Sequence, residues 1–378
     1  MHYDTLMNRT CTWFLSLGLG LAATALTACS ERHEVDLPPE ASEIIPQPWN
    51  VASPADVGLD ESALDALAAL VQGHGVVVRD GRLVYSWGDP SRPVDVASAC
   101  KPVISTLLMF ALQEGRVKSI DDPVVKVDPR LKQLPGRKDQ RITFRHLASQ
   151  TSGYGHTETP GAAWAYNDYA LAYYYDVLTD LVFQRDGTGL LRNRLAQPLG
   201  FQDQFSFHAS HAGRLAISTR DFAKLGVFYL QRGRWNDEQI LEARYVDLMV
   251  SHPVPADLPR TRGEEAPMLP GQRSLGGRGP DGKDLLEEGP GYYSFNWWVN
   301  QPDGVAAPLY PALPPDTFVA DGHVHRHKLW VIPGYDMVVV WLNTRISGNK
   351  ELCERATELI RAALAGNQNA YATPAPAP

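Results

Sequence analysis

The stretch that decides the fold is "SACK", Ser98 to Lys101, followed at once by the apolar run "PVISTLLMFALQEG", residues 102–115. Proline is tolerated only in the first turn of a helix, because its ring clashes with the carbonyl group four residues back. Pro102 therefore predicts a helix whose N-terminus lies beside Ser98, and Gly115 suits the position just after its end. Positions i and i+3 share a helix face, so Ser98 and Lys101 can meet.

This spacing allows two interpretations. One is an ordinary amphipathic helix with an N-capping serine and a surface lysine. The other is a nucleophile with its base, because a serine hydroxyl is a weak nucleophile that needs one. A lysine amine serves as that base only when burial or a nearby positive charge keeps it neutral. The rest of the chain decides between the two.

The 378 residues are 44% hydrophobic and 21% charged, with a formal net charge of -8. This is enough for one large domain, or two interleaved ones, with a substantial core. The charges are mixed along the chain, without the basic patch or stripe that is usual in nucleic-acid-binding proteins. We therefore expect no nucleic-acid partner.

Residues 1–29 have the order of an export signal: Arg9, an apolar segment, and small residues before Cys29. The segment ends in "LTAC", which resembles the bacterial lipobox, where the cysteine thiol is lipidated. A plain signal peptide or a membrane anchor with a chance cysteine stays open. The acidic, Pro-rich residues 30–49 are predicted to be a tether. Ser30, by resemblance to Gram-negative lipoproteins, favours the outer membrane, so we expect a periplasmic lipoprotein anchored by lipid at Cys29.

Short-range patterns predict the elements around the Ser98 helix. Asp60 suits the N-cap of a helix with apolar residues from Leu64 to Val71 on one face. Asp80-Gly81, between two β-rich runs, suits a type I′ hairpin turn, in which φ is positive at both central residues. The remaining predictions are mainly helices over 98–250, a long surface loop over 251–290, strands within 293–300, 317–322, 327–332 and 336–343, a helix over about 350–364 and a disordered tail over 366–378.

This order predicts one α/β unit made of two pieces, 50–97 and 291–365, with the mainly helical part 98–250 inserted between them. The Ser98 helix then lies at the junction of the two parts. Pockets tend to form at such junctions.

Five further segments resemble one family in their sequence and in their order. They are "LQEGRVKSIDDPV" (112–124), "ITFRHLASQTSGYG" (142–155), "AQPLGF" (196–201), "STRDFAKLGVFYLQRGRW" (218–235) and "LWVIPGYDMVVVWLN" (329–343). With the S-x-x-K they are similar to the serine β-lactamase-like family of the class C type, which includes DD-peptidases, carboxylesterases and amide hydrolases. The resemblance covers 50–365. It implies an α/β plus all-α fold of the β-lactamase/transpeptidase type, an antiparallel sheet flanked by helices with an inserted helical domain.

Carried over to this chain, the resemblance makes Ser98 the nucleophile and Lys101 its base partner. The second family motif, Tyr-x-Asn, is matched by Tyr166-Asn167-Asp168. Tyr166 would take or relay a proton beside Lys101, a role that suits a phenol only if the cation holds its pKa down; the simpler alternative is one more aromatic residue at a Tyr-rich helix start. Asp168 stands where asparagine is usual and would repel an anionic substrate. Asn167 is our candidate to replace that missing amide.

The third family motif, Lys-Thr-Gly on a strand beside the nucleophile, is matched by Ala320-Asp321-Gly322. Gly322 lets the strand approach the substrate closely. The resemblance assigns the oxyanion hole to the backbone N–H groups of Ser98 and His323. The usual lysine, which helps to hold the substrate carboxylate in β-lactamases and DD-peptidases, is absent. Candidates to replace it are His325, Arg326 and Lys328.

The run "HVHRH", 323–327, raises the alternative of a metal site. On a strand, His323, His325 and His327 would share a face, and three histidines can bind zinc. No acidic residue lies within the run and no histidine follows it. We therefore expect no metal and no cofactor, and we place His323 or His325 in the substrate pocket.

Structural roles are expected for five other side chains. Cys100 and Cys353 could form a disulfide in an exported protein, but their positions in helix patterns favour buried thiols. His146 is expected to be a hydrogen-bonded structural histidine. Trp297 and Trp298 are expected in the pocket wall or in the core.

These residues together predict a serine hydrolase that cleaves an ester or amide, in a small molecule or peptide, through an acyl-enzyme on Ser98. We expect it to act as a monomer. One alternative is a β-lactamase or DD-peptidase, which the missing lysine and Asp168 disfavour. The second alternative is a non-catalytic lipoprotein that binds peptidoglycan or a partner through the same pocket, which the retained Lys101 and Tyr166 disfavour.

Overall fold

The computed structural model describes residues 44–251, 253–276, 288–302 and 307–364. The expected export signal, the lipidation site Cys29, the first part of the tether and the C-terminal tail lie outside these residues. Within the described part of the chain, no helix is both long enough and apolar enough to cross a membrane.

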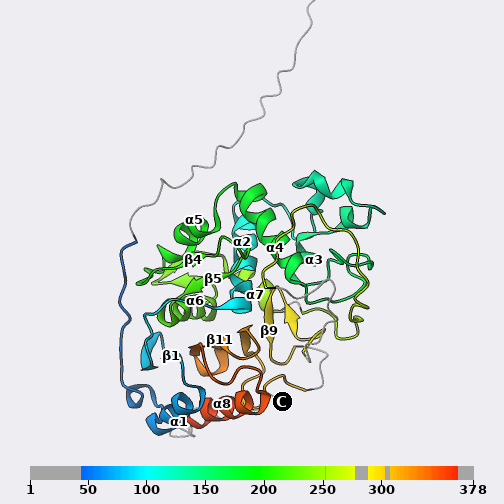
Figure 1. Ribbon diagram of the computed structural model, residues 1–378. Coiled ribbons are helices and arrows are strands. Elements are labelled where there is room, and N and C mark those ends of the chain that lie inside the picture. Colours follow the sequence, from blue (N-terminus) through cyan, green and yellow to red (C-terminus); the bar gives the residue numbers. More distant parts are fainter. Residues whose placement is uncertain (1–43, 252, 277–287, 303–306, 365–378) are drawn as a thin grey trace, which may run out of the picture. The chain divides into compact units, whose positions relative to one another are not determined.

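A seven-stranded antiparallel sheet forms the centre of the α/β part (Figure 1). In spatial order its strands are β2 (Arg82–Trp87), β1 (His74–Arg79), β12 (Met337–Leu342), β11 (His327–Ile332), β10 (Phe318–Gly322), β9 (Trp297–Val299) and β8 (Tyr293–Ser294). The turn between β1 and β2 has the predicted geometry, with φ of 50° at Asp80 and 69° at Gly81. Strands from both ends of the chain thus share one sheet, and the predicted antiparallel α/β fold is confirmed.

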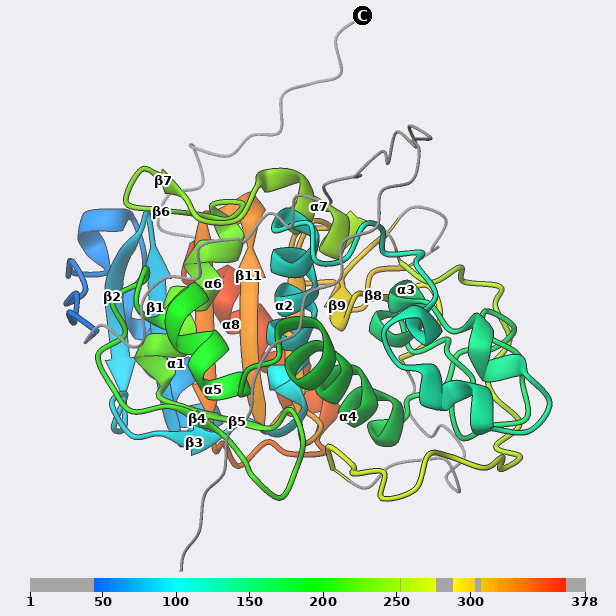
Figure 2. The ribbon, with the colours of Figure 1, turned by 90° about the horizontal axis from the view of Figure 1, so that it is seen from above.

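Helices cover both faces of this sheet (Figure 2). Alternate strand residues such as Val77 and Trp341 pack with α1 (Glu61–Val71) and α8 (Lys350–Ala362) on one face. Their neighbours, such as Val338, pack against α6 (Thr219–Leu230) on the other face. The helix α6 lies within 98–250, the range predicted to form the inserted helical part. It packs on the sheet instead, because its apolar face, including the close-approach position Gly226, lies against β11 and β12.

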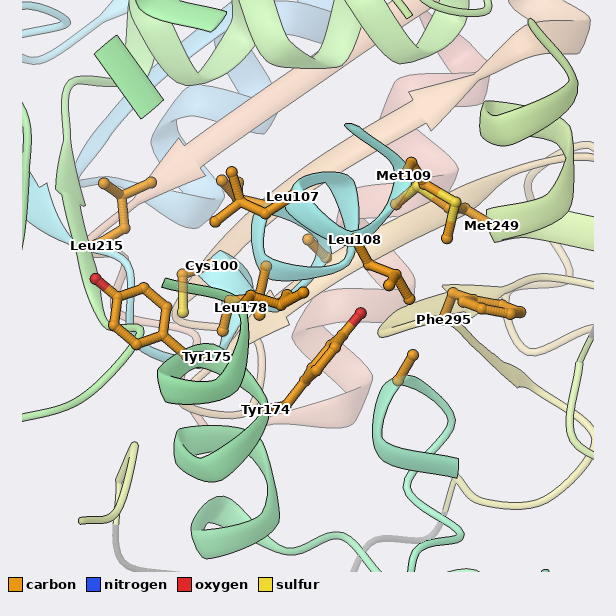
Figure 3. Close-up of a cluster of buried hydrophobic side chains, with 14 of the residues drawn as sticks. Cys100, Leu107, Leu108, Met109, Tyr174, Tyr175, Leu178, Leu215, Met249 and Phe295 are labelled. Carbon is orange, nitrogen blue, oxygen red and sulfur yellow. The ribbon is translucent and has the colours of Figure 1, made fainter. Parts of the chain in front are cut away.

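The helical part surrounds α2 (Lys101–Gln113), in which every residue from Lys101 to Ala111 is buried. Leu107, Leu108 and Cys100 pack in one cluster with apolar residues of the helix that follows Tyr166 (Figure 3). The other helices are α3 (Phe144–Ala148), α4 (Asp168–Asp176), α5 (Gly187–Leu191) and α7 (Ala243–Ser251). This burial from both sides fixes the position of the helix that carries the S-x-x-K.

Five short strands were missed by the sequence analysis. They are β3 (Val94–Asp95), β5 (Leu215–Ile217) and β4 (Ser206–Phe207), which form a three-stranded sheet in that order, and β6 (Arg234–Trp235) with β7 (Glu238–Gln239). Strands of two or three residues are too short to show an alternating pattern. The first of these sheets matters for the site, because β3 leads directly into the turn that carries Ser98.

The described parts of the predicted loop over 251–290 lie against the helical part. Isolated bridges join Arg260 to Trp164 and Glu265 to His156. The backbone N–H of Leu275 donates to the carbonyl oxygen of Asp168 at 3.1 Å. This loop therefore reaches the Tyr-x-Asn position of the predicted site.

Candidate active site

Ser98 lies in a single 3-10 turn, Ala97–Cys100, that runs directly into α2. Ala97 has a φ of 49°, in the left-handed region that strains a residue with a Cβ. The Asp95 carboxylate accepts the Ala97 N–H at 2.9 Å and so supports this conformation. Ser98 is partly buried and lines a cavity of about 350 Å3. The helix start predicted from Pro102 is therefore correct.

Lys101 and Tyr166 meet beside Ser98. The Lys101 side chain is 1% exposed, and its Nζ forms a hydrogen bond with the Tyr166 hydroxyl. The same nitrogen lies 3.7 Å from the centroid of the Tyr166 ring. Ser98 is a second hydrogen-bond partner of the Tyr166 hydroxyl. The structure thus brings together the three residues that the sequence placed in one site.

The protonation of Tyr166 differs from the sequence expectation. Burial, followed by the negative charge of Asp168, raises its pKa well above the ordinary value, and the hydrogen bond from Ser98 only partly opposes this. A pKa held down by the lysine was the condition for Tyr166 to take the proton as a base, and burial opposes that condition. Tyr166 is a neutral phenol at neutral pH, suited to pass a proton between two neighbours and unsuited to act as a standing phenolate base.

Asn167 and Asp168 have different places in the structure. Asn167 is the N-cap of α4, where its side-chain oxygen accepts the N–H groups of Tyr169 and Ala170 at 2.9 and 3.2 Å. Its side-chain nitrogen donates to the carbonyl oxygen of Tyr154 at 2.8 Å. This amide is committed to the backbone and does not have the substrate contact that we expected. Asp168, 3% exposed, does line the cavity.

The end of β10 lies against the Ser98 turn. A Cβ on Gly322 would stand 2.2 Å from the Val96 carbonyl oxygen and 3.0 Å from the Ala99 nitrogen. Only glycine permits this approach. His323 follows directly and lines the same cavity as Ser98. Ser98 and His323, the two residues predicted to supply the oxyanion-hole N–H groups, therefore lie next to the contact between Gly322 and the Ser98 turn.

The histidine run is a turn and not a strand. Residues 323–326 connect β10 to β11, so the run is not the continuous strand that the zinc alternative requires. His323 is exposed, whereas His325 and His327 are buried. Burial and the positive charge of Arg214 lower the pKa of His323, and burial lowers that of His327 to about 4. Among the described residues, no group of three or more metal-ligating side chains is close enough to hold a metal ion.

A buried polar network lies under this turn. Asp321 forms an ion pair with Lys328 at 2.8 Å, contacts the His325 Nδ1 at 3.0 Å and accepts the His325 backbone N–H at 2.7 Å. Lys328 also donates to the Tyr310 hydroxyl at 2.8 Å, and the Cys353 thiol hydrogen-bonds with His325. His325 lines the cavity, but both sides of its ring have protein partners.

Several residues of the cavity wall were not identified from the sequence. They are Ala97, Arg214, Leu275, Glu288 and Tyr310. Arg214 pairs with Asp95 at 2.8 Å, so it supports the Ser98 turn from behind. The segment 218–235 that resembles the family begins just after Arg214 and does not include it. Leu275, Glu288 and Tyr310 come from distant segments and carried no motif.

The structural expectations for the remaining side chains hold. Cys100 and Cys353 are free, buried thiols, and burial raises the pKa of Cys100 to about 12. His146 accepts the Thr143 backbone N–H at 3.1 Å in a capping box. Of the two tryptophans, Trp298 lines the cavity and Trp297 lies in the core.

Comparison with solved structures supports the fold. A penicillin-binding protein homologue from Caulobacter crescentus superposes with a TM-score of 0.57 at 15% identity, covering 86% of this chain and 100% of that one. EstCE1, a hydrolase with promiscuous acyltransferase activity, gives a TM-score of 0.56 at 17% identity, covering 82% and 97%. At these identities the likeness shows a shared β-lactamase/transpeptidase-like fold.

Sequence comparison extends this result. An uncharacterized protein of Alkalihalophilus pseudofirmus is 26% identical over 209 residues, which are 46% of this chain and 57% of that protein. The chain thus matches little more than half the length of this relative. The family model Beta-lactamase matches residues 65–364, most of the chain. Members of this family are typically hydrolases. The chain therefore belongs to the Beta-lactamase family.

Proposed function

We propose that the protein is a serine hydrolase that cleaves an ester or amide through an acyl-enzyme on Ser98. The observation that carries this proposal is the hydrogen-bonded chain from Ser98 through the Tyr166 hydroxyl to the buried amine of Lys101, at the wall of one cavity. A nucleophile, a proton relay and a buried base in contact are what acyl transfer requires.

In the first half-reaction the Ser98 Oγ attacks the carbonyl carbon of the substrate. Its proton passes to the Tyr166 hydroxyl, which at the same time gives its own proton to the neutral amine of Lys101. Tyr166 stays uncharged throughout, in agreement with its raised pKa. When the tetrahedral intermediate collapses, the same relay runs in reverse and protonates the leaving alcohol or amine.

The N–H groups of Ser98 and His323 would hold the negative charge that develops on the carbonyl oxygen. Preorganised donors of this kind usually make the largest single contribution to catalysis. Water then attacks the carbonyl carbon of the acyl-enzyme and gives its proton to the relay. When this second intermediate collapses, the bond to Ser98 Oγ breaks, the relay returns the proton to Ser98 Oγ, and the acid leaves. The close contact of Gly322 with the Ser98 turn supports this pairing of donors.

The cavity favours an uncharged acyl group. The cations in its wall already have carboxylate partners: Arg214 pairs with Asp95, and His325 pairs with Asp321. Asp168 adds a negative charge beside Tyr166. Trp298, Leu275 and Val324 supply apolar surface. An ester or amide with an apolar acyl group therefore fits better than the carboxylate-bearing β-lactams and D-Ala-D-Ala peptides.

The test is a substrate panel of p-nitrophenyl esters, anilides and the β-lactam nitrocefin, with Ser98→Ala as the control. We expect turnover of esters or anilides with short apolar acyl groups, lost in the control. Nitrocefin turnover that exceeds ester turnover would support the β-lactamase alternative. No turnover by a folded protein, with binding of muropeptides, would support the binding-protein alternative.

For localisation, we propose export and lipid attachment at Cys29, supported by the "LTAC" segment. Growth with labelled palmitate should place label on the wild-type protein and none on Cys29→Ser. Labelling of the Cys29→Ser variant at the wild-type level would contradict the lipid attachment.

A monomer in detergent solution is expected, which light scattering measures.

A further inference from the structure

The turn that carries His323 is strained. His323, Val324 and His325 have φ of 49°, 48° and 72°, three left-handed residues in succession, and none of them is glycine. Side chains with a Cβ rarely adopt this conformation, and such strain persists only where the surroundings impose it. The turn follows Gly322 directly, so it decides where the His323 N–H points.

The Asp321 carboxylate holds this turn from the strand side. One of its oxygens accepts the His325 backbone N–H at 2.7 Å, and the other contacts the His325 Nδ1 at 3.0 Å. The second oxygen also pairs with Lys328 at 2.8 Å. Lys328 is fully buried, and the Asp321 side chain is 14% exposed. One carboxylate thus ties the backbone and the side chain of the turn to β10 and β11.

The turn's carbonyl groups are held from the opposite side. Ser347 donates its hydroxyl to the His323 carbonyl oxygen at 2.8 Å, and the Gly348 N–H donates to that of Val324 at 2.7 Å. The Trp341 indole donates to the His325 carbonyl oxygen at 3.1 Å. These contacts fix the carbonyl groups of the turn. The His325 N–H and side chain depend on Asp321 instead.

We propose that Asp321, held in place by Lys328, is a positioning residue for acyl transfer: it keeps the strained 323–326 turn in the conformation that presents the His323 N–H as an oxyanion donor. The proposal rests on the proposed function. The family motif has threonine at this position, whose hydroxyl cannot form the two-oxygen contact with His325 or the ion pair with Lys328. This chain has therefore replaced a neutral side chain with a charged support for the turn.

The test compares Asp321→Ala with Asp321→Asn in the full-length protein. Asp321→Ala removes all three contacts, whereas Asp321→Asn retains a carbonyl oxygen for the His325 N–H. We expect kcat for the best ester substrate to fall roughly 10- to 100-fold in Asp321→Ala and less in Asp321→Asn, with KM within about threefold, because only the transition state uses the donor. In hydrogen exchange, a peptide spanning 318–330 should lose protection in Asp321→Ala.

The matched control is Asp221→Asn. Asp221 is also buried, also accepts backbone N–H groups and also lies near a lysine, Lys224, but on α6 away from the cavity. It should lower the melting temperature and leave kcat unchanged. If Asp321→Ala does not fold, Lys328→Met provides the same comparison, because it removes the cation that holds the carboxylate.

The outcomes separate this inference from the proposed function. Unchanged kcat and unchanged exchange at 323–326 in Asp321→Ala would overturn the positioning role while the hydrolase activity stands. A rise in KM alone would overturn it too, since that indicates a substrate contact. A wild-type protein without turnover would overturn the proposed function, and unchanged exchange in Asp321→Ala would then still exclude Asp321 as the support of the turn.

Discussion

A Cβ atom on Gly322 would lie 2.2 Å from the carbonyl oxygen of Val96. Val96 stands directly before the turn that carries Ser98, so the end of β10 touches the backbone of the nucleophile's own segment. There is no space for a side chain between them. The two predicted oxyanion donors can therefore lie together only when residue 322 is glycine.

Gly322→Ala should separate these donors. We expect kcat to fall by about 100-fold or more, because the loss of one oxyanion donor has an effect of that size. The matched control is Gly226→Ala, whose Cβ would meet Val338 at 2.5 Å in the core. This control should lower the melting temperature without lowering kcat. Wild-type kcat in Gly322→Ala would contradict the assignment of the oxyanion hole.

Tyr166→Phe removes the hydroxyl that links Ser98 to Lys101. We expect kcat to fall about 10²- to 10⁴-fold, the range for the loss of a general acid–base group. Tyr174→Phe is the control, because Tyr174 is buried in the helical core and its hydroxyl does not line the cavity. Steady-state kinetics on one ester substrate measures both. Retention of more than half of the wild-type kcat in Tyr166→Phe would rule out the relay.

Asp168→Asn restores the residue that is usual in the family. The negative charge of Asp168 opposes any anionic substrate, so its removal should favour a carboxylate-bearing ester over its methyl ester. We expect this ratio of kcat/KM values to rise about tenfold, a free-energy difference of about 1.4 kcal/mol. Asp128→Asn is the control. The Asp128 carboxylate is also buried and accepts the Tyr173 hydroxyl, but it does not line the cavity. An equal rise in the control would show that the effect is not local.

His325 gives the stability a defined pH dependence. Burial and the Lys328 charge oppose its protonation, but hydrogen bonds with Asp321 and Cys353 outweigh them and raise its pKa to about 9. Because the folded-state pKa lies above the unfolded one, protonation of His325 stabilises the folded protein. This stabilisation is fully present below about pH 6.5 and is lost as the pH rises through 9. The contribution is about 3 kcal/mol at most.

The measurement is the difference in unfolding free energy between wild type and His325→Gln at pH 6 and pH 10. A comparison of variants is needed because burial lowers the pKa of Lys224 to about 8, which makes stability rise with pH in the same range. Subtraction cancels that effect. We expect the difference to shrink at pH 10. A difference of the same size at both pH values would show that His325 is neutral in the folded protein.

Local sequence patterns were sufficient for much of the fold. Pro102 located the helix start because its ring excludes any earlier turn, and Asp80-Gly81 located the hairpin because both residues adopt positive φ. The strands on either side of 323–326 were predicted to end at Gly322 and to begin at His327, as they do. The left-handed turn between them was not predicted, because three successive non-glycine residues with positive φ show no local pattern. The contact of Gly322 with Val96, more than 200 positions away, also has no local signal.

The candidate site was predictable where a motif carried it. Ser98, Lys101 and Tyr166 came from motifs, and they meet. Asn167 was assigned to the substrate because its role as N-cap depends on where α4 begins, which a Tyr-rich segment does not mark. Asp321 was named only as the middle residue of the third motif. Its role as the centre of a buried network depends on Lys328, its partner across the β10–β11 hairpin.

The central claim is a nucleophilic Ser98, and intact-mass analysis after treatment with a fluorophosphonate probe tests it most directly. The account predicts one adduct on the wild-type protein, none on a folded Ser98→Ala variant, and much slower labelling of Tyr166→Phe. No adduct on a folded wild-type protein, or the same adduct on Ser98→Ala, would contradict the account.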